Sequence, residues 1–297
     1  MAESLLDRVI RRQAWMDGLA GAIQGGVGAV YGVLGKPGRW LKDLLHGTRI
    51  LGHPLHPAVT DLPMGAWTAG VVADYAAHLT PRIGTEAGDI ALAVGLGGAV
   101  LSALTGYTDF HETFGQERRI ALLHGGLMTV VLGIEGFSLG MRWWAGEGAH
   151  PTAVVLSTAG LGLAVAASWL GGHLVFGIGT TVNRSAFLEG PEDFVAVGTP
   201  GDFAEGQMRA VDASGMQVLV VRLQGRLHAI SDVCSHAGGP LHEGSLQGDT
   251  VICPWHASRF CVRDGRVEGG PATFSQPSLV VRENRTAVEV KLEAPLH

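Results

Sequence analysis

The chain opens with apolar positions at helical spacing and continues with long apolar segments. Residues 1–52 place Leu5 and Val9 at roughly helical spacing with charged residues such as Arg8 between them, which predicts an amphipathic segment. The uncharged, glycine-rich run 18–35 is expected to lie at a membrane interface rather than to cross. Four longer apolar segments follow, each near the ~20 residues that cross a hydrocarbon core. They cover residues 57–79, 88–108, 120–141 and 152–176.

After about residue 188 the apolar runs become short and acquire strand character, with turns such as Gln224-Gly225 between them. No internal repeat is evident. The predicted fold class is an α + β multidomain chain, a membrane four-helix bundle followed by an all-β domain. The expected domains are an amphipathic N-terminal segment at 1–52, transmembrane helices at 53–178, a linker at 179–190 and the β domain at 191–297.

Composition agrees with this division. Only 16% of the 297 residues are charged, against about 25% in an ordinary soluble domain, and the deficit lies in the first 180 residues. The net charge of −6 excludes a general nucleic-acid partner. With four spans, the opposite loops carry only Arg82 and Arg142, while the other basic residues share the side of both termini. The positive-inside rule then predicts a multi-pass inner-membrane protein whose termini and β domain are cytoplasmic.

The most specific chemistry lies in two short runs, Cys234-Ser235-His236 and Cys253-Pro254-Trp255-His256. The residues around them are Gly239-Pro240-Leu241, Ser258-Arg259-Phe260 and Gly269-Gly270-Pro271-Ala272. Together these runs resemble the Rieske iron–sulfur family. The resemblance implies a [2Fe-2S] cluster in which Cys234 and Cys253 hold the inner iron and His236 and His256 the outer iron. Two Cys and two His also suit tetrahedral zinc, but zinc fingers usually group Cys with Cys and His with His.

Departures from the family pattern are informative. Relatives in quinol-oxidising complexes carry a disulfide where this chain has Gly239 and Trp255, and a tyrosine where it has Phe260. Ser258, Phe260 and Pro271 are expected to surround the cluster, and fewer hydrogen bonds to sulfur imply a lower potential. The loops look like those of soluble Rieske ferredoxins. The remaining thiol, Cys261, is predicted to be buried and free.

A second resemblance is carried by His53-Pro54-Leu55-His56-Pro57 and Thr60-Asp61-Leu62-Pro63-Met64-Gly65. These runs resemble a bacterial four-helix membrane family of unassigned function that is often fused to Rieske domains. The resemblance covers about residues 45–178. It implies little about chemistry.

Ionisable groups within membrane spans are costly and by default mark function. Five histidines are expected at the cytoplasmic face, namely His53, His56, His111, His124 and His173. Three alternatives stay open: haem b between His124 and His173, a metal or quinone site that uses some of His53, His56 and His111, or ordinary hydrogen bonds to backbone carbonyls. Near the far side, Asp74 and Glu135 either share a proton or face a water-filled gap.

These observations predict a membrane-anchored Rieske protein that carries single electrons between redox donor and acceptor proteins or a quinone. It is expected to be an electron-transfer component rather than a stand-alone enzyme, with no catalytic residue of its own. A redox-sensing or assembly module is the first alternative. An oxygenase is the second, and it needs a mononuclear iron site in a large additional domain.

Overall fold

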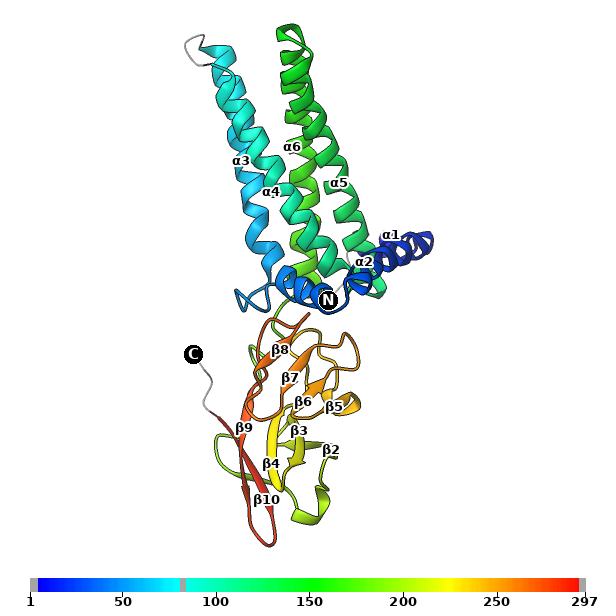
Figure 1. Ribbon diagram of the computed structural model, residues 1–297, viewed down its shortest axis with the longest axis vertical. Helices are drawn as coiled ribbons and strands as arrows, with labels where there is room; N and C mark the ends of the chain where they lie inside the picture. Colours follow the sequence, from blue (N-terminus) through cyan, green and yellow to red (C-terminus); the bar gives the residue numbers. More distant parts are fainter. Residues whose placement is uncertain (1–4, 81–83, 294–297) are drawn as a thin grey trace. The chain divides into compact units, whose positions relative to one another are not determined.

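The computed structural model describes residues 5–80 and 84–293 and divides the chain into two compact units (Figure 1). The first, here called the helical unit, comprises the residues up to Leu41 and Leu55–Thr180. The second, the β unit, comprises Lys42–Pro54 together with the residues from Thr181 onward. Residues 42–54, which begin within one helix and end just before the next, therefore group with the C-terminal part of the chain.

Six α-helices and one π-helical turn make up most of the first part of the chain. Their bounds are α1 Leu5–Arg11, α2 Trp15–His46, α3 Leu55–Leu79, α4 Glu86–Phe110, α5 Gly115–Trp144, α6 His150–Gly172 and η2 His173–Ile178. Helices α3 to α6 form an up-and-down bundle in which α3 packs along α4 and α5 along α6 (Figure 1). The beginnings of α3 and α5 consequently share one end of the bundle.

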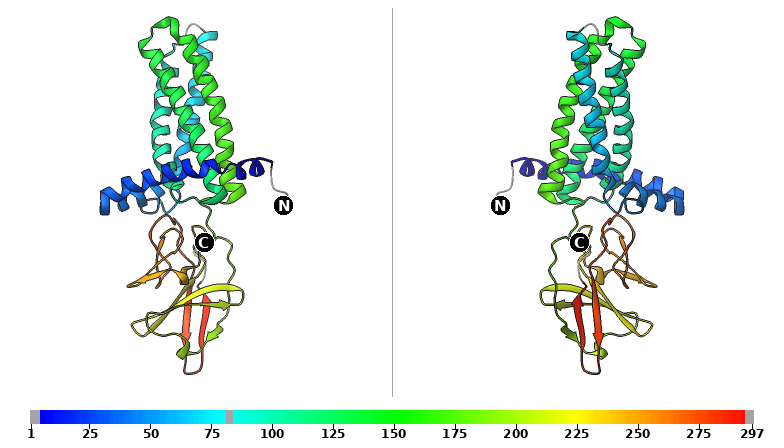
Figure 2. Two further views of the ribbon diagram at one scale, coloured as in Figure 1. Left: turned by 90° about the vertical axis from the view of Figure 1, so that its right-hand side faces the viewer. Right: turned by 90° about the vertical axis from the view of Figure 1, so that its left-hand side faces the viewer.

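Four helices among the described residues are long and apolar enough to cross a membrane: α2, α4, α5, and α6 continued through η2. Three coincide with predicted spans, whereas α3, which carries Asp61 and Asp74, is not among them. Helix α2 has a backbone break at Gly35 (φ 59°, ψ −126°) and runs crosswise at one end of the bundle (Figure 2). The side-chain amide of Gln24 in α2 donates to Phe110 O at the end of α4, at 2.8 Å, and so connects α2 to the bundle. This arrangement fits a helix that lies along an interface.

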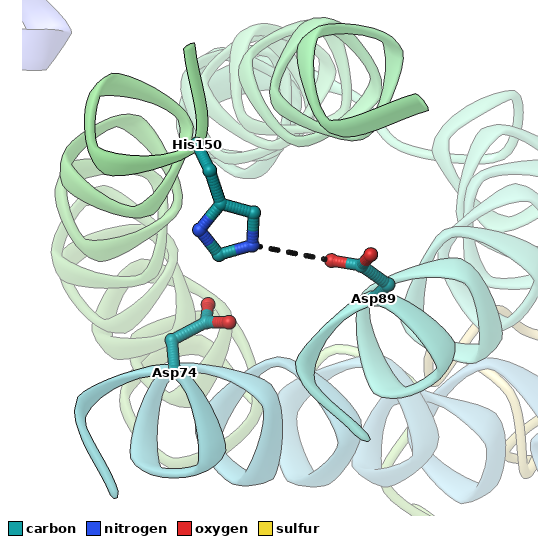
Figure 3. A group of neighbouring side chains, drawn as sticks. All are labelled: Asp74, Asp89 and His150. Atoms are coloured by element: carbon teal, nitrogen blue, oxygen red, sulfur yellow. Dashed lines mark ion pairs between the residues drawn. The ribbon is translucent and has the colours of Figure 1, made fainter. Parts of the chain in front are cut away.

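Charged side chains meet at the opposite end of the bundle. Arg142 donates to both oxygens of Asp74, at 2.8 and 2.6 Å, and to Asp89 at 3.0 Å. His150 lies 3.7 Å from Asp89 (Figure 3). The ligand atoms of Asp74, Asp89 and His150 lie within 4.8 Å of one another, but the guanidinium already supplies a cation there. The ion-pair partner of Asp74 is thus Arg142, which neither alternative for Asp74 and Glu135 included.

The β unit consists of two antiparallel sheets. The larger has the strand order β1-β10-β9-β4-β3-β2 and the smaller β5-β6-β7-β8. The strands are β1 Val195–Gly198, β2 Met208–Ala213, β3 Met216–Leu223, β4 Arg226–Ser231, β5 Ser245–Gln247, β6 Thr250–Ile252, β7 Arg259–Cys261, β8 Val267–Gly269, β9 Ser278–Glu283 and β10 Val288–Leu292. Successive strand residues point to opposite faces, so Val218 and Val220 enter one core while Leu219 and Val221 enter the other. The second core also contains Cys234, Cys253 and Phe260.

The buried ion pair predicts a specific stability pattern. Asp74 and Arg142 side chains are each 1% exposed. Asp74→Ala leaves the Arg142 guanidinium buried with only Asp89 as an acidic partner. This is expected to lower the free energy of unfolding by about 3 kcal/mol. Asp74→Ala/Arg142→Leu is expected to recover most of this loss. Unfolding of the detergent-solubilised chain, followed by helical circular dichroism, measures both. Equal stability of the single and double variants would contradict the account.

Candidate metal centre

Two loops of the β unit carry the Cys–His runs and close on themselves in the same way. In the loop after β4, Cys234 N–H donates to Gly239 O at 2.9 Å and Cys234 O accepts from Gly238 N–H at 2.8 Å. In the loop after β6, Cys253 makes the equivalent bonds with Ser258 O at 2.8 Å and Ala257 N–H at 3.1 Å. Gly238 and Ala257 both have positive φ, 82° and 59°, which a tight turn needs at that position.

The loops bring the four predicted ligands into one place. Cys234 and Cys253 are 1% and 3% exposed, and both thiols are free. The neighbouring Cys253 thiol, together with burial, raises the pKa of the Cys234 thiol, whereas the same interaction lowers the pKa of Cys253. The rings of His236 and His256 lie edge to face with centroids 4.9 Å apart. Their Nδ1 atoms are buried although the rings are only half-buried.

This donor set fits a [2Fe-2S] cluster of the mixed thiolate–imidazole type. Two interacting buried thiols suit one iron, and two adjacent imidazoles with inward Nδ1 atoms suit the other. When bound, such a cluster takes up and releases one electron at a time. The half-buried rings then place an edge of the ligand set toward the surface.

The residues expected around the cluster lie in three places, Ser258 in the loop after β6, Phe260 in β7 and Pro271 in the loop after β8. Ser258 Oγ accepts from Ala272 N–H at 3.0 Å, so its own hydrogen remains available for a further acceptor. Phe260 is fully buried in the core that contains both cysteines. Pro271 precedes Ala272 in the third loop, 269–272.

Gly239 and Trp255 face each other across the two loops. A Cβ at Gly239 would lie 2.9 Å from Trp255 Cδ2 and 3.0 Å from Cys253 Sγ. The positions that carry a disulfide in quinol-oxidising relatives are thus occupied by a glycine under an indole, and the indole is 51% exposed. Cys261 is buried, and burial raises the pKa of its thiol, as expected of an unreactive core cysteine.

A segment that was not predicted to be part of the site packs on the third loop, 269–272. Asp43 Oδ1 accepts from Gly270 N–H at 3.0 Å, and Thr48 donates to Ala272 O at 2.9 Å. His53, expected among the membrane histidines, contacts Phe274 edge to face at 5.9 Å. We call residues 42–54 the strap. No periodicity marks it, because its contacts are with residues more than two hundred positions further along the chain.

The other four histidines lie in the helical unit. The rings of His56 and His124 are neighbours, with centroids 6.3 Å apart. His173 stacks on Trp169 instead, so the ring beside His124 is that of His56 and not that of His173, which the haem alternative paired with it. His111 Nδ1 lies 3.0 Å from Glu112 Oε1.

Comparisons with known proteins agree with this geometry. Residues 193–280 match the Rieske [2Fe-2S] domain family, and residues 52–184 match a family described as a predicted membrane protein (DUF2231). The ferredoxin component of biphenyl 2,3-dioxygenase from Rhodococcus jostii (strain RHA1) is 38% identical over 93 residues, which cover 31% of this chain and 87% of that protein.

Two further relatives each match about a third of the chain. Apoptosis-inducing factor 3 of Homo sapiens is 36% identical over 103 residues, or 34% of this chain, and the match spans only 17% of that protein. Among solved structures, the ferredoxin of carbazole 1,9a-dioxygenase from Nocardioides aromaticivorans IC177 is 31% identical, with 34% of this chain and 98% of that chain covered and a TM-score of 0.33.

The paired Cys–His loops on an antiparallel β unit thus define an iron–sulfur domain. The chain belongs to the Rieske [2Fe-2S] family through residues 193–280. Family relatives include ferredoxin components of oxygenase systems, and membership supports a [2Fe-2S] cluster. The chain also contains a predicted membrane domain of the second family. Nothing in these comparisons supports haem.

The strap predicts a measurable contribution to the stability of the β unit. Asp43→Ala removes the acceptor of Gly270 N–H and is expected to cost about 1 kcal/mol. The matched control is Asp193→Ala, since Asp193 is an exposed residue of the same unit. Thermal unfolding of the full chain, followed by the visible circular dichroism of the cluster, compares the variants. An unfolding temperature that falls equally in both variants would argue against the strap.

Proposed function

We propose that this protein is a membrane-anchored Rieske electron carrier that passes single electrons between redox partner proteins or a quinone. The observation that carries the proposal is the convergence of two buried thiols and two half-buried imidazoles on paired loops. In this assignment Cys234 and Cys253 hold the inner iron, and His236 and His256 hold the outer iron. The exposed edge near His256 and Trp255 is where a partner docks.

Anchoring in the bacterial inner membrane, with both termini and the β unit in the cytoplasm, is part of the proposal. Three apolar bundle helices of sufficient length and the match to a membrane-protein family support it. The excess of basic residues on the side of the termini supports the orientation. A cytoplasmic site also suits a cluster loop without a disulfide, because that compartment is reducing.

One relative guides the choice of partners. The Rhodococcus relative is the ferredoxin component of a dioxygenase, so delivery of electrons to another protein is the favoured role. A redox-sensing or assembly role is the competing proposal, and it requires no sustained electron flux. A component of an oxygenase system is the remaining alternative.

Ligand variants test the cluster assignment. Cys253→Ser and His256→Ala are each expected to lose the iron and acid-labile sulfide that wild type holds in equal amounts, since each removes a proposed iron ligand. Cys261→Ser is the matched control, because that thiol is buried in β7 outside the two loops. This variant should keep both its iron and its sulfide. Chemical analysis of the purified full chain gives the result. Retention of iron and sulfide by Cys253→Ser would overturn the assignment.

Electron flux separates a carrier from a sensor. Membranes that contain wild type are expected to sustain steady reduction of an acceptor by a physiological electron donor, and membranes with His256→Ala are not. Cys261→Ser membranes should behave as wild type. An unchanged flux in His256→Ala membranes would favour the sensing or assembly role.

A further inference from the structure

The bundle consists of two helical hairpins, α3–α4 and α5–α6, which share short runs of identical residues at equivalent positions. The run Gly95-Leu96-Gly97 with Ala99-Val100 in α4 recurs as Gly160-Leu161-Gly162 with Ala164-Val165 in α6. In the first helix of each hairpin, His56, Trp67 and Asp74 of α3 have the same spacing as His124, Glu135 and Arg142 of α5.

Contacts within the hairpins follow the same correspondence. A Cβ at Gly95 would collide with Trp67, and a Cβ at the equivalent Gly160 would collide with Glu135. The equivalent Asp74 and Arg142 form the ion pair between the two hairpins. Because both hairpins start at the same end of the bundle, a pseudo-twofold axis parallel to the helices relates them.

The two histidines occupy equivalent places in this repeat. His56 Nδ1 lies 3.0 Å from Ser102 O and 3.2 Å from Thr105 Oγ1 on α4. His124 Nδ1 lies 2.8 Å from Ala167 O on α6, the position equivalent to Ser102. Of the three corresponding pairs in α3 and α5, only this one has the same residue in both hairpins.

A glycine makes room for each histidine ring. The glycine lies one helical turn after the residue whose carbonyl the ring contacts. A Cβ at Gly106 would lie 2.8 Å from His56 Cε1, and a Cβ at Gly171 would lie 3.1 Å from His124 Cε1. An alanine at either place would push the ring from its position. The two histidine rings therefore occupy equivalent positions against α4 and α6.

The carbonyl contacts determine which ring nitrogen carries the proton. A carbonyl oxygen only accepts, so Nδ1 of each histidine is the N–H donor, and Nε2 of the neutral ring keeps a lone pair. Histidines that bind metals almost always donate their other N–H to a carbonyl, carboxylate or water in this way. Both rings are only half-buried, and the centroids are 6.3 Å apart.

We propose that His56 and His124 form a bis-imidazole metal site on the pseudo-twofold axis, with Nε2 of each as ligand. Neutral imidazole suits copper, iron, zinc and nickel, and binding sites in repeat folds commonly lie at the interface between the repeats. The site takes a transition-metal centre that accepts two imidazoles, as a free ion or as the iron of a porphyrin. It deepens the proposed function by adding an electron partner within the chain, but its existence does not depend on electron flux.

The test uses the cluster-loaded full chain in detergent, with Cu²⁺ and haem as separate probes. Wild type is expected to bind one equivalent of one probe, by equilibrium dialysis for Cu²⁺ or by visible absorption for haem. His56→Gln and His124→Gln should each weaken binding by about tenfold or more, since each removes one of two ligands. His78→Gln, an exposed histidine also on α3, is the matched control and should bind as wild type.

A second pair of variants leaves both ligands in place. Gly106→Ala and Gly171→Ala displace the rings and are expected to weaken binding of the same probe, while Gly97→Ala, where a Cβ meets nothing within 4 Å, is not. Equal affinity in all histidine variants, or no binding of either probe by folded wild type, would overturn the proposal. The cluster signal of each variant is recorded in parallel, so loss of the metal site is distinguishable from failure of the Rieske centre.

Discussion

The backbone hydrogen bonds that close the two cysteine loops are the constraint on which the metal centre depends. Each loop ties the peptide groups of its cysteine to residues four and five positions further on, which turns the thiol into the core and leaves the histidine at the rim. The third loop and the strap then cover the centre with further polar contacts. Backbone N–H groups of His236 and Ala237 bond to the Cys234 thiol, and those of Trp255 and His256 bond to Cys253. The loop conformation therefore compensates the burial of the two sulfur atoms.

The helical unit obeys a related constraint, because its apolar helices leave few partners for a polar group. Asp74 and Arg142 satisfy each other between the hairpins. His56 and His124, at the other end of the same helices, bond to carbonyls of α4 and α6 instead. Both pairs join equivalent positions of the two hairpins, Asp74 with Arg142 and His56 with His124.

The ligand runs and the two-part architecture were predictable from the sequence, because each depends on residues close together in the chain. Cys234 and His236 share one loop, and strand and helix periods are local. The strap was not predictable, since Asp43 and Thr48 bond to residues of the third loop far along the chain. The position of His124 along its helix predicted how far into the membrane its side chain lies. It did not predict which way α5 turns that side chain, and the structure places His56 rather than His173 beside it. The repeat was missed because few positions are identical.

The central claim is that one chain holds a Rieske cluster in a membrane. The most direct measurement is the electron paramagnetic resonance spectrum of dithionite-reduced, washed membranes that contain the full chain. The account predicts a Rieske-type signal that sediments with the membranes and disappears in a one-electron oxidation. Absence of that signal from membranes in which the chain is present, or its release by a salt wash, would contradict it.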